Sequence, residues 1–176
     1  NEEHREFDLH QALDMCLNLL TNQLKHRVVV RRDYGTVAKV IGPAGQLNQV
    51  FMNLLSNAQQ AIPGEGEIVI TTRQEGAWLK VSIRDNGTGI PAEVKQKIFD
   101  PFFTTKEPGQ GTGLGLSLSY GILTKLGGTI ECFSEPGQGA EFVVRIPNRP
   151  AEAGPVAAVL FDSSSIVVSS QGGAIA

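Results

Sequence analysis

The chain has few of the residues on which metal centres and disulfide-rich proteins depend. Among its 176 residues there are only two cysteines and three histidines, and Cys16 and Cys132 lie far apart. The sequence contains no CxxC pair and no histidine cluster, so it predicts neither a zinc site nor a disulfide framework. We expect both cysteines to be core thiols in a reducing compartment.

Long apolar runs and a strong net charge are also absent. No run reaches the roughly eighteen apolar residues that a membrane-spanning helix needs, and no signal peptide is visible. The formal net charge of -3 comes without a basic stripe, which argues against nucleic-acid binding. We expect a cytoplasmic fragment without direct membrane contact. Because the chain starts with Asn1, its parent is expected to be longer and is free to carry a membrane anchor.

Glycine, by contrast, is plentiful and clustered. Two clusters stand out, Asp85-Asn-Gly-Thr-Gly-Ile90 and Gly111-Thr-Gly-Leu-Gly-Leu116. Glycine lets a backbone approach a flat ring or a phosphate closely, and it adopts positive φ without strain. The second cluster opens into an apolar helical run, and the N–H groups at a helix start attract anions. The sequence therefore predicts a nucleotide pocket with a flexible lid.

Apolar periodicity predicts helices that alternate with half-exposed strands. Asp8 suits the N-cap of a helix reaching Leu24, a second apolar stripe runs from Gly45 to Ile62, and Pro91 suits the start of a short helix ending at Ile98. Strands are expected at residues 28–30, 38–41, 68–70, 78–84, 129–133 and 141–146. This order predicts an α+β fold, a two-layer α/β sandwich with a mixed, mostly antiparallel sheet and helices on one face.

The second predicted helix carries an asparagine pair, Asn53 and Asn57. Residues four apart share one face of a helix, so the two amides project together beside the apolar stripe. Amide oxygen suits Mg²⁺, which prefers oxygen ligands and keeps several waters. Without the glycine clusters, the pair would be better explained as two polar residues on a solvated face.

Four motifs in this order resemble the catalytic and ATP-binding domain of sensor histidine kinases, within the superfamily that includes gyrase, the Hsp90 chaperone and MutL. Residues 53–62 resemble its N box, 85–90 its G1 box, 99–106 its F box and 111–116 its G2 box. The Phe-Phe-Thr-Thr-Lys form of the F box is similar to that of the nitrogen-regulation kinases. The resemblance implies a Bergerat-type fold that binds ATP and Mg²⁺.

The resemblance also divides the chain. It implies a catalytic domain at residues 1–148, with similarity from about residue 7, followed by a linker and a tail at residues 149–176. The tail contains strand-like stretches at residues 156–161 and 166–168. Its role stays open: it could begin another domain, pair with a sheet edge or be irrelevant to activity.

The resemblance implies roles at the base end of the pocket. Asp85 would accept a hydrogen bond from the adenine amino group, Gly87 and Gly89 would let the backbone pass beside the base, and Ile90 would also contact the nucleotide. Without the ordered motifs, Asp85-Asn-Gly would be interpreted as an Asx turn closing a hairpin. The F-box phenylalanines Phe99, Phe102 and Phe103 are expected to anchor the lid to the core.

At the phosphate end, Asn57 would bind Mg²⁺ and Asn53 would lie beside the triphosphate. Lys106 would add positive charge near the γ-phosphate, although a lysine in a lid is often simply solvated. Asn53 and Lys106 are the implied catalytic residues. The further nucleotide contacts that the resemblance implies are Thr105, Gly111, Thr112, Gly113, Leu114, Gly115 and Leu116.

The identity of residue 53 separates branches of the superfamily. Hydrolysing members have a glutamate four residues before the magnesium asparagine, where it activates water. Here that residue is Asn53, whose amide cannot take a proton at neutral pH. The resemblance thus implies transfer of the phosphoryl group with little hydrolysis.

Some residues depart from the family pattern. Gln60 stands where many sensor kinases have a basic residue, and Ala140 replaces a frequent Ser or Thr. The phosphoacceptor box is missing, because His4, His10 and His26 fit no such motif and are expected to be surface residues, the last two on the first helix. The resemblance therefore implies two partners, a histidine-containing dimerisation domain of a homodimeric parent and a response regulator.

Other readings of the chain fit less well or stay open. Gly87 to Ala92 matches the loose dinucleotide pattern GxGxxA, but the preceding strand alternates polar and apolar residues, unlike a buried parallel strand. No Walker A sequence occurs. A regulatory nucleotide-binding module without transfer activity remains the open alternative.

Overall fold

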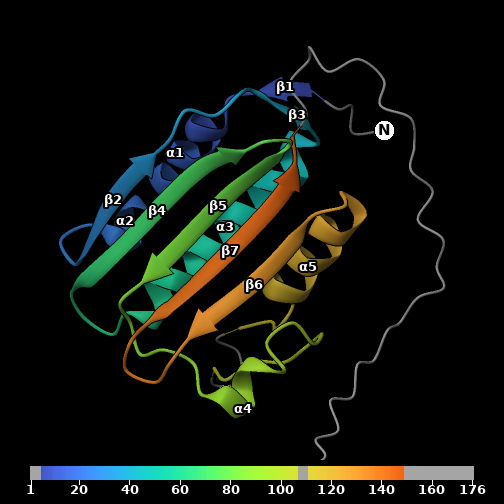
Figure 1. The fold of residues 1–176 in the computed structure, drawn as a ribbon. Helices are drawn as coiled ribbons and strands as arrows, with labels where there is room; N and C mark the ends of the chain where they lie inside the picture. The colour runs from blue at the N-terminus through green and yellow to red at the C-terminus, as the bar shows by residue number, and fades with distance from the viewer. Residues whose placement is uncertain (1–4, 107–110, 149–176) are drawn as a thin grey trace, which may run out of the picture.

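The computed structural model describes residues 5–106 and 111–148. They form two layers, a five-stranded sheet and a layer of helices on one of its faces (Figure 1). The strand order is β2-β4-β5-β7-β6, and only the β2–β4 pair is parallel. The predicted α+β sandwich with a mostly antiparallel sheet is confirmed. Its strands are β2 (Val28–Tyr34), β4 (Gly66–Glu75), β5 (Trp78–Asp85), β6 (Thr129–Ser134) and β7 (Ala140–Pro147).

Helix α3 (Ala44–Ala61) forms the centre of the helical layer and packs against α1 (Leu9–Leu19), α5 (Gly115–Lys125) and β5. Its apolar stripe is fully buried, with Val50, Phe51 and Leu54 at 0% exposure. The opposite wall of the core comes from alternate positions of β4, β5 and β7, because side chains in a strand alternate between faces. Asn53 and Asn57 lie beside this stripe and are only partly buried.

The first helix begins as predicted but ends earlier. The Asp8 carboxylate accepts a hydrogen bond from the Gln11 N–H at 3.0 Å, which caps α1. The helix ends at Leu19 with Leu20 as its C-cap, and a separate turn, α2 (Thr21–Leu24), continues the apolar stripe. His26 follows α2 with a φ of 66°, so the prediction that it lies on the first helix was wrong.

Other boundaries also differ from the predictions. A short strand β1 (Arg5–Phe7) pairs with β3 (Val40–Gly42), which starts two residues later than predicted. Strand β2 extends to Tyr34 because it pairs with β4 along its whole length. The short helix after Pro91 is one turn only, α4 (Ala92–Lys95). Local apolar patterns do not reveal such pairing partners, which are distant in sequence.

The end of α5 fixes the start of β6. Gly127 has a φ of 72°, its N–H donates to the Thr124 carbonyl, and the Gly128 N–H donates to the Leu123 carbonyl. These two bonds form a Schellman motif, which turns the chain sharply back into β6. The predicted strands at residues 156–161 and 166–168 lie outside the described residues.

Both cysteines are free thiols, as predicted. Cys16 is buried in the core, and Cys132 is half-buried in β6. Burial raises the pKa of both, that of Cys132 to about 11, so both stay protonated at neutral pH. Among the helices that the structure describes, none combines the length and the hydrophobicity that spanning a bilayer requires.

Candidate functional site

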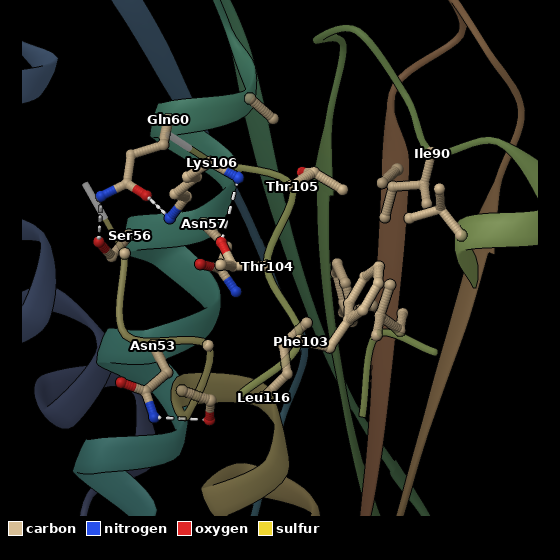
Figure 2. Close-up of a pocket in the computed structure, with 18 of the residues that line it drawn as sticks. Asn53, Ser56, Asn57, Gln60, Ile90, Phe103, Thr104, Thr105, Lys106 and Leu116 are labelled. Atoms are coloured by element: carbon tan, nitrogen blue, oxygen red, sulfur yellow. Dashed lines mark hydrogen bonds between the residues drawn. The ribbon is translucent and has the colours of Figure 1, made fainter. Parts of the chain in front are cut away.

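A cavity of about 650 Å³ opens between α3, the end of β5, the start of α5 and residues 103–106. Its volume lies within the range of roughly 300–1,000 Å³ that is typical of small-molecule sites. Figure 2 shows the polar residues of α3 on one side, with Ile90 and Phe103 on the other. The apolar part of the lining consists of Ala61, Ile90, Pro91, Val94, Ile98, Phe103, Leu116, Ala140 and Phe142.

Asp85 is the acidic group of the apolar end. It is the last residue of β5, only 3% exposed, and one carboxylate oxygen accepts the Gly87 N–H at 2.8 Å. Burial raises the pKa of Asp85, and the Gly87 N–H partly offsets that effect by stabilising the charged form. The Asx turn and a ligand acceptor are therefore compatible, because a carboxylate has further lone pairs to offer.

The loop after Asp85 is held by backbone bonds on both sides. The Thr88 N–H donates to the Ala61 carbonyl at the end of α3, and the Gly137 N–H donates to the Thr88 carbonyl at 2.7 Å. A Cβ on Gly89 would lie 2.0 Å from the Glu135 carbonyl oxygen. Only glycine fits there, so the close approach that the sequence predicted serves to pack this loop against the turn between β6 and β7.

The polar face of α3 lines the opposite wall. Asn53 donates through its amide nitrogen to the Gly115 carbonyl at 3.0 Å and to Ser119 Oγ at 3.2 Å. These bonds tie α3 to the start of α5 and hold the two helices together beside the cavity. Asn57, one turn further along, also lines the cavity (Figure 2). The two amides thus share one face, as the spacing predicted.

Lys106 lies beside α3 in the wall of the cavity (Figure 2). Its ammonium donates to the Gln60 side-chain oxygen, and the Gln60 amide nitrogen donates to Ser56 Oγ at 3.2 Å (Figure 2). The exposed Lys106 side chain is thereby held beside Gln60, and both residues line the cavity.

The N-terminus of α5 completes the site. Leu114 is its N-cap, and no side chain caps the first turn. The preceding loop is shaped by Gly113, which has a φ of 67° and whose Cβ would lie 2.5 Å from the Phe102 backbone. Uncapped N–H groups carry partial positive charge, so this end of the cavity suits an anion.

Most predicted site residues line one cavity, with two exceptions. Gly87 and Leu114 are not part of the lining. A Cβ on Gly87 would lie 2.2 Å from the Ala61 carbonyl oxygen, so Gly87 allows the loop to pack on α3. The predicted residues that line the cavity are Asn53, Asn57, Asp85, Gly89, Ile90, Thr105, Lys106, Gly111, Thr112, Gly113, Gly115 and Leu116.

One predicted anchor was wrong. Phe99 and Phe103 pack against the core, but Phe102 is 75% exposed. Its φ of 65° turns the side chain outward while its backbone covers Gly113. Val94, Ile98 and Phe142 were missed as lining residues. The alternation of β7 could have revealed Phe142, whereas the other two depend on the packing of α4.

The histidines behave differently from one another. His10 is not a free surface residue: its Nε2 lies 2.8 Å from Thr72 Oγ1, and its ring stacks on Tyr34 with centroids 4.2 Å apart. His26 is exposed, as predicted, and His4 lies outside the described residues. Within residues 5–106 and 111–148, no group of three or more His, Cys, Asp or Glu is placed to bind a metal.

Comparisons with known proteins agree with this geometry. Residues 42–150, more than half of the chain, match the family described as "Histidine kinase-, DNA gyrase B-, and HSP90-like ATPase". The chain is 39% identical over 171 residues to the sensor kinase CckA of Brucella abortus (strain 2308). That alignment covers 86% of the chain but only 18% of CckA, so the chain spans less than a fifth of that relative's length.

Two solved structures of one histidine kinase, ThkA, are similar in fold. The catalytic domain of ThkA has a TM-score of 0.75 and 32% identity, covering 84% of this chain and 99% of that one. ThkA in complex with the response regulator protein TrrA has a TM-score of 0.71 and 28% identity, covering 85% of this chain and 43% of that one. The family model matches more than half of the chain, and the fold is that of the ThkA catalytic domain. The chain therefore belongs to the histidine kinase-, DNA gyrase B- and HSP90-like ATPase family.

Proposed function

We propose that this chain is the ATP-binding catalytic domain of a two-component sensor kinase. It transfers the γ-phosphoryl group of ATP to a histidine on a separate dimerisation domain, which passes it to a response regulator. The observation that carries the proposal is that a buried acceptor, Asp85, and the uncapped start of α5 open into one cavity. That arrangement suits a ligand with an amino-bearing ring at one end and phosphates at the other.

The base lies at the apolar end in this proposal. Asp85 accepts a hydrogen bond from the adenine amino group, and Ile90 and Phe103 pack against the ring. A buried acceptor rejects a ring that presents another acceptor, because both groups would lose their bonds to water without gaining a partner. The site therefore selects adenine over guanine, whose corresponding atom is a carbonyl oxygen.

The phosphates lie at the polar end. The glycine-rich residues 111–115 and the first turn of α5 offer N–H groups, and Lys106 adds positive charge from the cavity mouth. Thr105 and Leu116 complete the contacts in this assignment.

Asn57 is the residue that would hold Mg²⁺. Its amide oxygen suits the ion, but one amide is too few ligands for a metal to bind without nucleotide. The ion would arrive with the phosphates and neutralise their charge during transfer.

The site favours transfer over hydrolysis. Asn53 has no basic group, and its side-chain nitrogen donates two hydrogen bonds that connect α3 to α5. In the transfer step, a ring nitrogen of the acceptor histidine forms a bond to the γ-phosphorus. At the same time, the bond between the γ-phosphorus and the oxygen that bridges it to the β-phosphate breaks. ADP leaves, and the imidazole releases its N–H proton. No residue of this chain has to activate water.

The partners follow from this chemistry. Because the described residues include no candidate acceptor histidine, the acceptor belongs to another domain of a dimeric parent protein, and a response regulator takes the phosphoryl group in turn. We place the domain in the cytoplasm, where ATP is available.

The experiment that tests the proposal uses ATP labelled at the γ-phosphate. The chain is incubated with the parent's histidine-bearing helical domain, and labelled protein is separated from free phosphate. We expect acid-labile label on the helical domain, none on this chain and little free phosphate. Rapid release of free phosphate by the chain alone would instead indicate an ATPase, and ATP binding without any labelled protein would indicate a regulatory module.

A further inference from the structure

The sheet register aligns three residues next to the base end of the cavity. Asp85 of β5 pairs with Ala140 of β7, and Ala140 pairs with Ser134 of β6. Strands β5, β7 and β6 lie side by side (Figure 1). Directly paired residues point to the same face of a sheet, so the three side chains lie in one row across these strands. Asp85 and Ala140 line the cavity, whereas Ser134, at the end of the row, does not.

The Ser134 hydroxyl joins two segments of the cavity wall. It donates to the Gly139 carbonyl at 2.7 Å and accepts the Ile90 N–H at 2.8 Å. A hydroxyl has one proton to donate, so the bond to Gly139 fixes which lone pairs remain for Ile90. The hydroxyl thereby connects the loop after Asp85 to the turn before β7.

No other side chain in the row bonds to both Ile90 and Gly139. Ala140 stands between Asp85 and Ser134 and has no polar atom in its side chain. Gly139 is itself held against the loop, because a Cβ there would lie 2.0 Å from the Asp85 carbonyl oxygen. The position of Ile90, which forms part of the apolar wall, therefore depends on Ser134 and on the backbone bond from Gly137 to Thr88.

We propose that Ser134 is a positioning residue for adenine, because its hydroxyl holds Ile90 and the Gly139 turn in the arrangement that the base requires beside Asp85. It acts through these two segments rather than by contact with the nucleotide. This inference rests on the proposed binding of ATP in the same cavity.

The test compares ligands that probe the two ends of the cavity separately. Ser134→Ala is expected to weaken binding of ATP and adenosine about tenfold, the size expected for losing two modest hydrogen bonds. Binding of tripolyphosphate with Mg²⁺, measured by competition, is expected to stay within twofold, because the phosphate end does not contact Ser134. Ser134→Thr retains the hydroxyl and is expected to restore adenosine binding.

Two further variants complete the design. Thr129→Ala removes an exposed hydroxyl from the other end of β6. It is expected to leave the affinities for adenosine and for tripolyphosphate unchanged. If Ser134→Ala does not fold, Ser134→Cys carries the test, because a thiol has similar size but is a weak hydrogen-bond partner. In the nucleotide-free protein, the Ile90 amide is expected to exchange its hydrogen faster in either variant.

Each outcome decides a separate point. Unchanged adenosine affinity in Ser134→Ala, or equal losses for adenosine and tripolyphosphate, would overturn the positioning role while leaving the proposed function standing. Loss of adenosine affinity in a folded Ser134→Thr would do the same. Failure of the unmutated chain to bind ATP at all would instead overturn the proposed function, and this inference with it.

Discussion

The two ends of the cavity are built in different ways. At the base end, Asp85, Gly87, Gly139 and Ala140 are buried, and the loop after β5 is bonded to both α3 and the turn before β7. At the phosphate end, residues 104–106 and Thr112 are exposed, and the Lys106 side chain is placed by Gln60. The comparison shows one end that is held by buried contacts, where we propose that the base binds, and one end that depends on exposed side chains, where we propose that the phosphates bind. Changes at the base end should therefore have larger effects.

The largest effect is expected for Asp85→Asn. The substitution keeps the volume but replaces a charged acceptor with an amide, and a charged hydrogen bond in a buried site stabilises binding by roughly 1.5–3 kcal/mol. ATP affinity measured by calorimetry should fall about a hundredfold, with the fold intact by circular dichroism. Asp33→Asn, at an exposed ion pair on β2, is the matched control and should have no effect. An unchanged affinity would remove Asp85 from the base site.

A smaller but specific loss is expected for Asn57→Ala. Magnesium should no longer strengthen ATP binding, and transfer should stop, because the phosphate charge would lack its metal partner. The measurement is ATP affinity with and without Mg²⁺. Gln49→Ala, exposed on the same helix, is the control. Equal magnesium stimulation in Asn57→Ala and the unmutated chain would show that Asn57 does not hold the ion.

Acidification should weaken ATP binding and, over the same pH range, increase the free energy of unfolding. Because burial raises the pKa of Asp85 in the folded state, the folded protein takes up a proton more readily than the unfolded chain does. Stability should therefore fall as pH rises from the ordinary aspartate pKa to the raised value, while ATP affinity increases over the same window. Urea unfolding and calorimetry across that range check both signs. Asp85→Asn should make both the free energy of unfolding and the ATP affinity less dependent on pH. If both quantities rose or fell together with pH in the unmutated chain, this account would be contradicted.

At the phosphate end, Lys106→Ala should weaken ATP binding only a few-fold and reduce its dependence on salt, since exposed charges are strongly screened. Gln60→Lys combined with Lys106→Ala places the charge on the helix instead and should restore most of the affinity. Affinity titrations at low and high salt provide the measurement. A loss as large as that of Asp85→Asn would contradict the difference between the two ends.

The smallest effect is expected for Phe102→Asn. Phe102 is exposed, and asparagine tolerates a positive φ better than phenylalanine does. ATP affinity should stay within twofold, and the free energy of unfolding should change by less than about 1 kcal/mol. A large loss of affinity would indicate that this side chain, and not only its backbone, supports the cavity.

The same contrast explains what the sequence could predict. The stripe on α3, the alternation of β5 and the glycines before α5 are local patterns, and the structure confirms their elements. The roles of Gly87 and Ser134 are not local, because they depend on contacts between the loop after β5, the end of α3 and the turn before β7. Phe102 failed as an anchor because an apolar residue type does not reveal a positive φ.

The central claim is that Asp85 selects adenine at a preformed base site. Calorimetric titration of the unmutated chain with ATP and with GTP, each with Mg²⁺, tests it most directly. The two ligands share their phosphates and ribose and differ in the group that would face Asp85. The account predicts saturable ATP binding with GTP at least about a hundredfold weaker, because two acceptors would meet in a buried site. Equal affinity for both, or no binding of either, would contradict it.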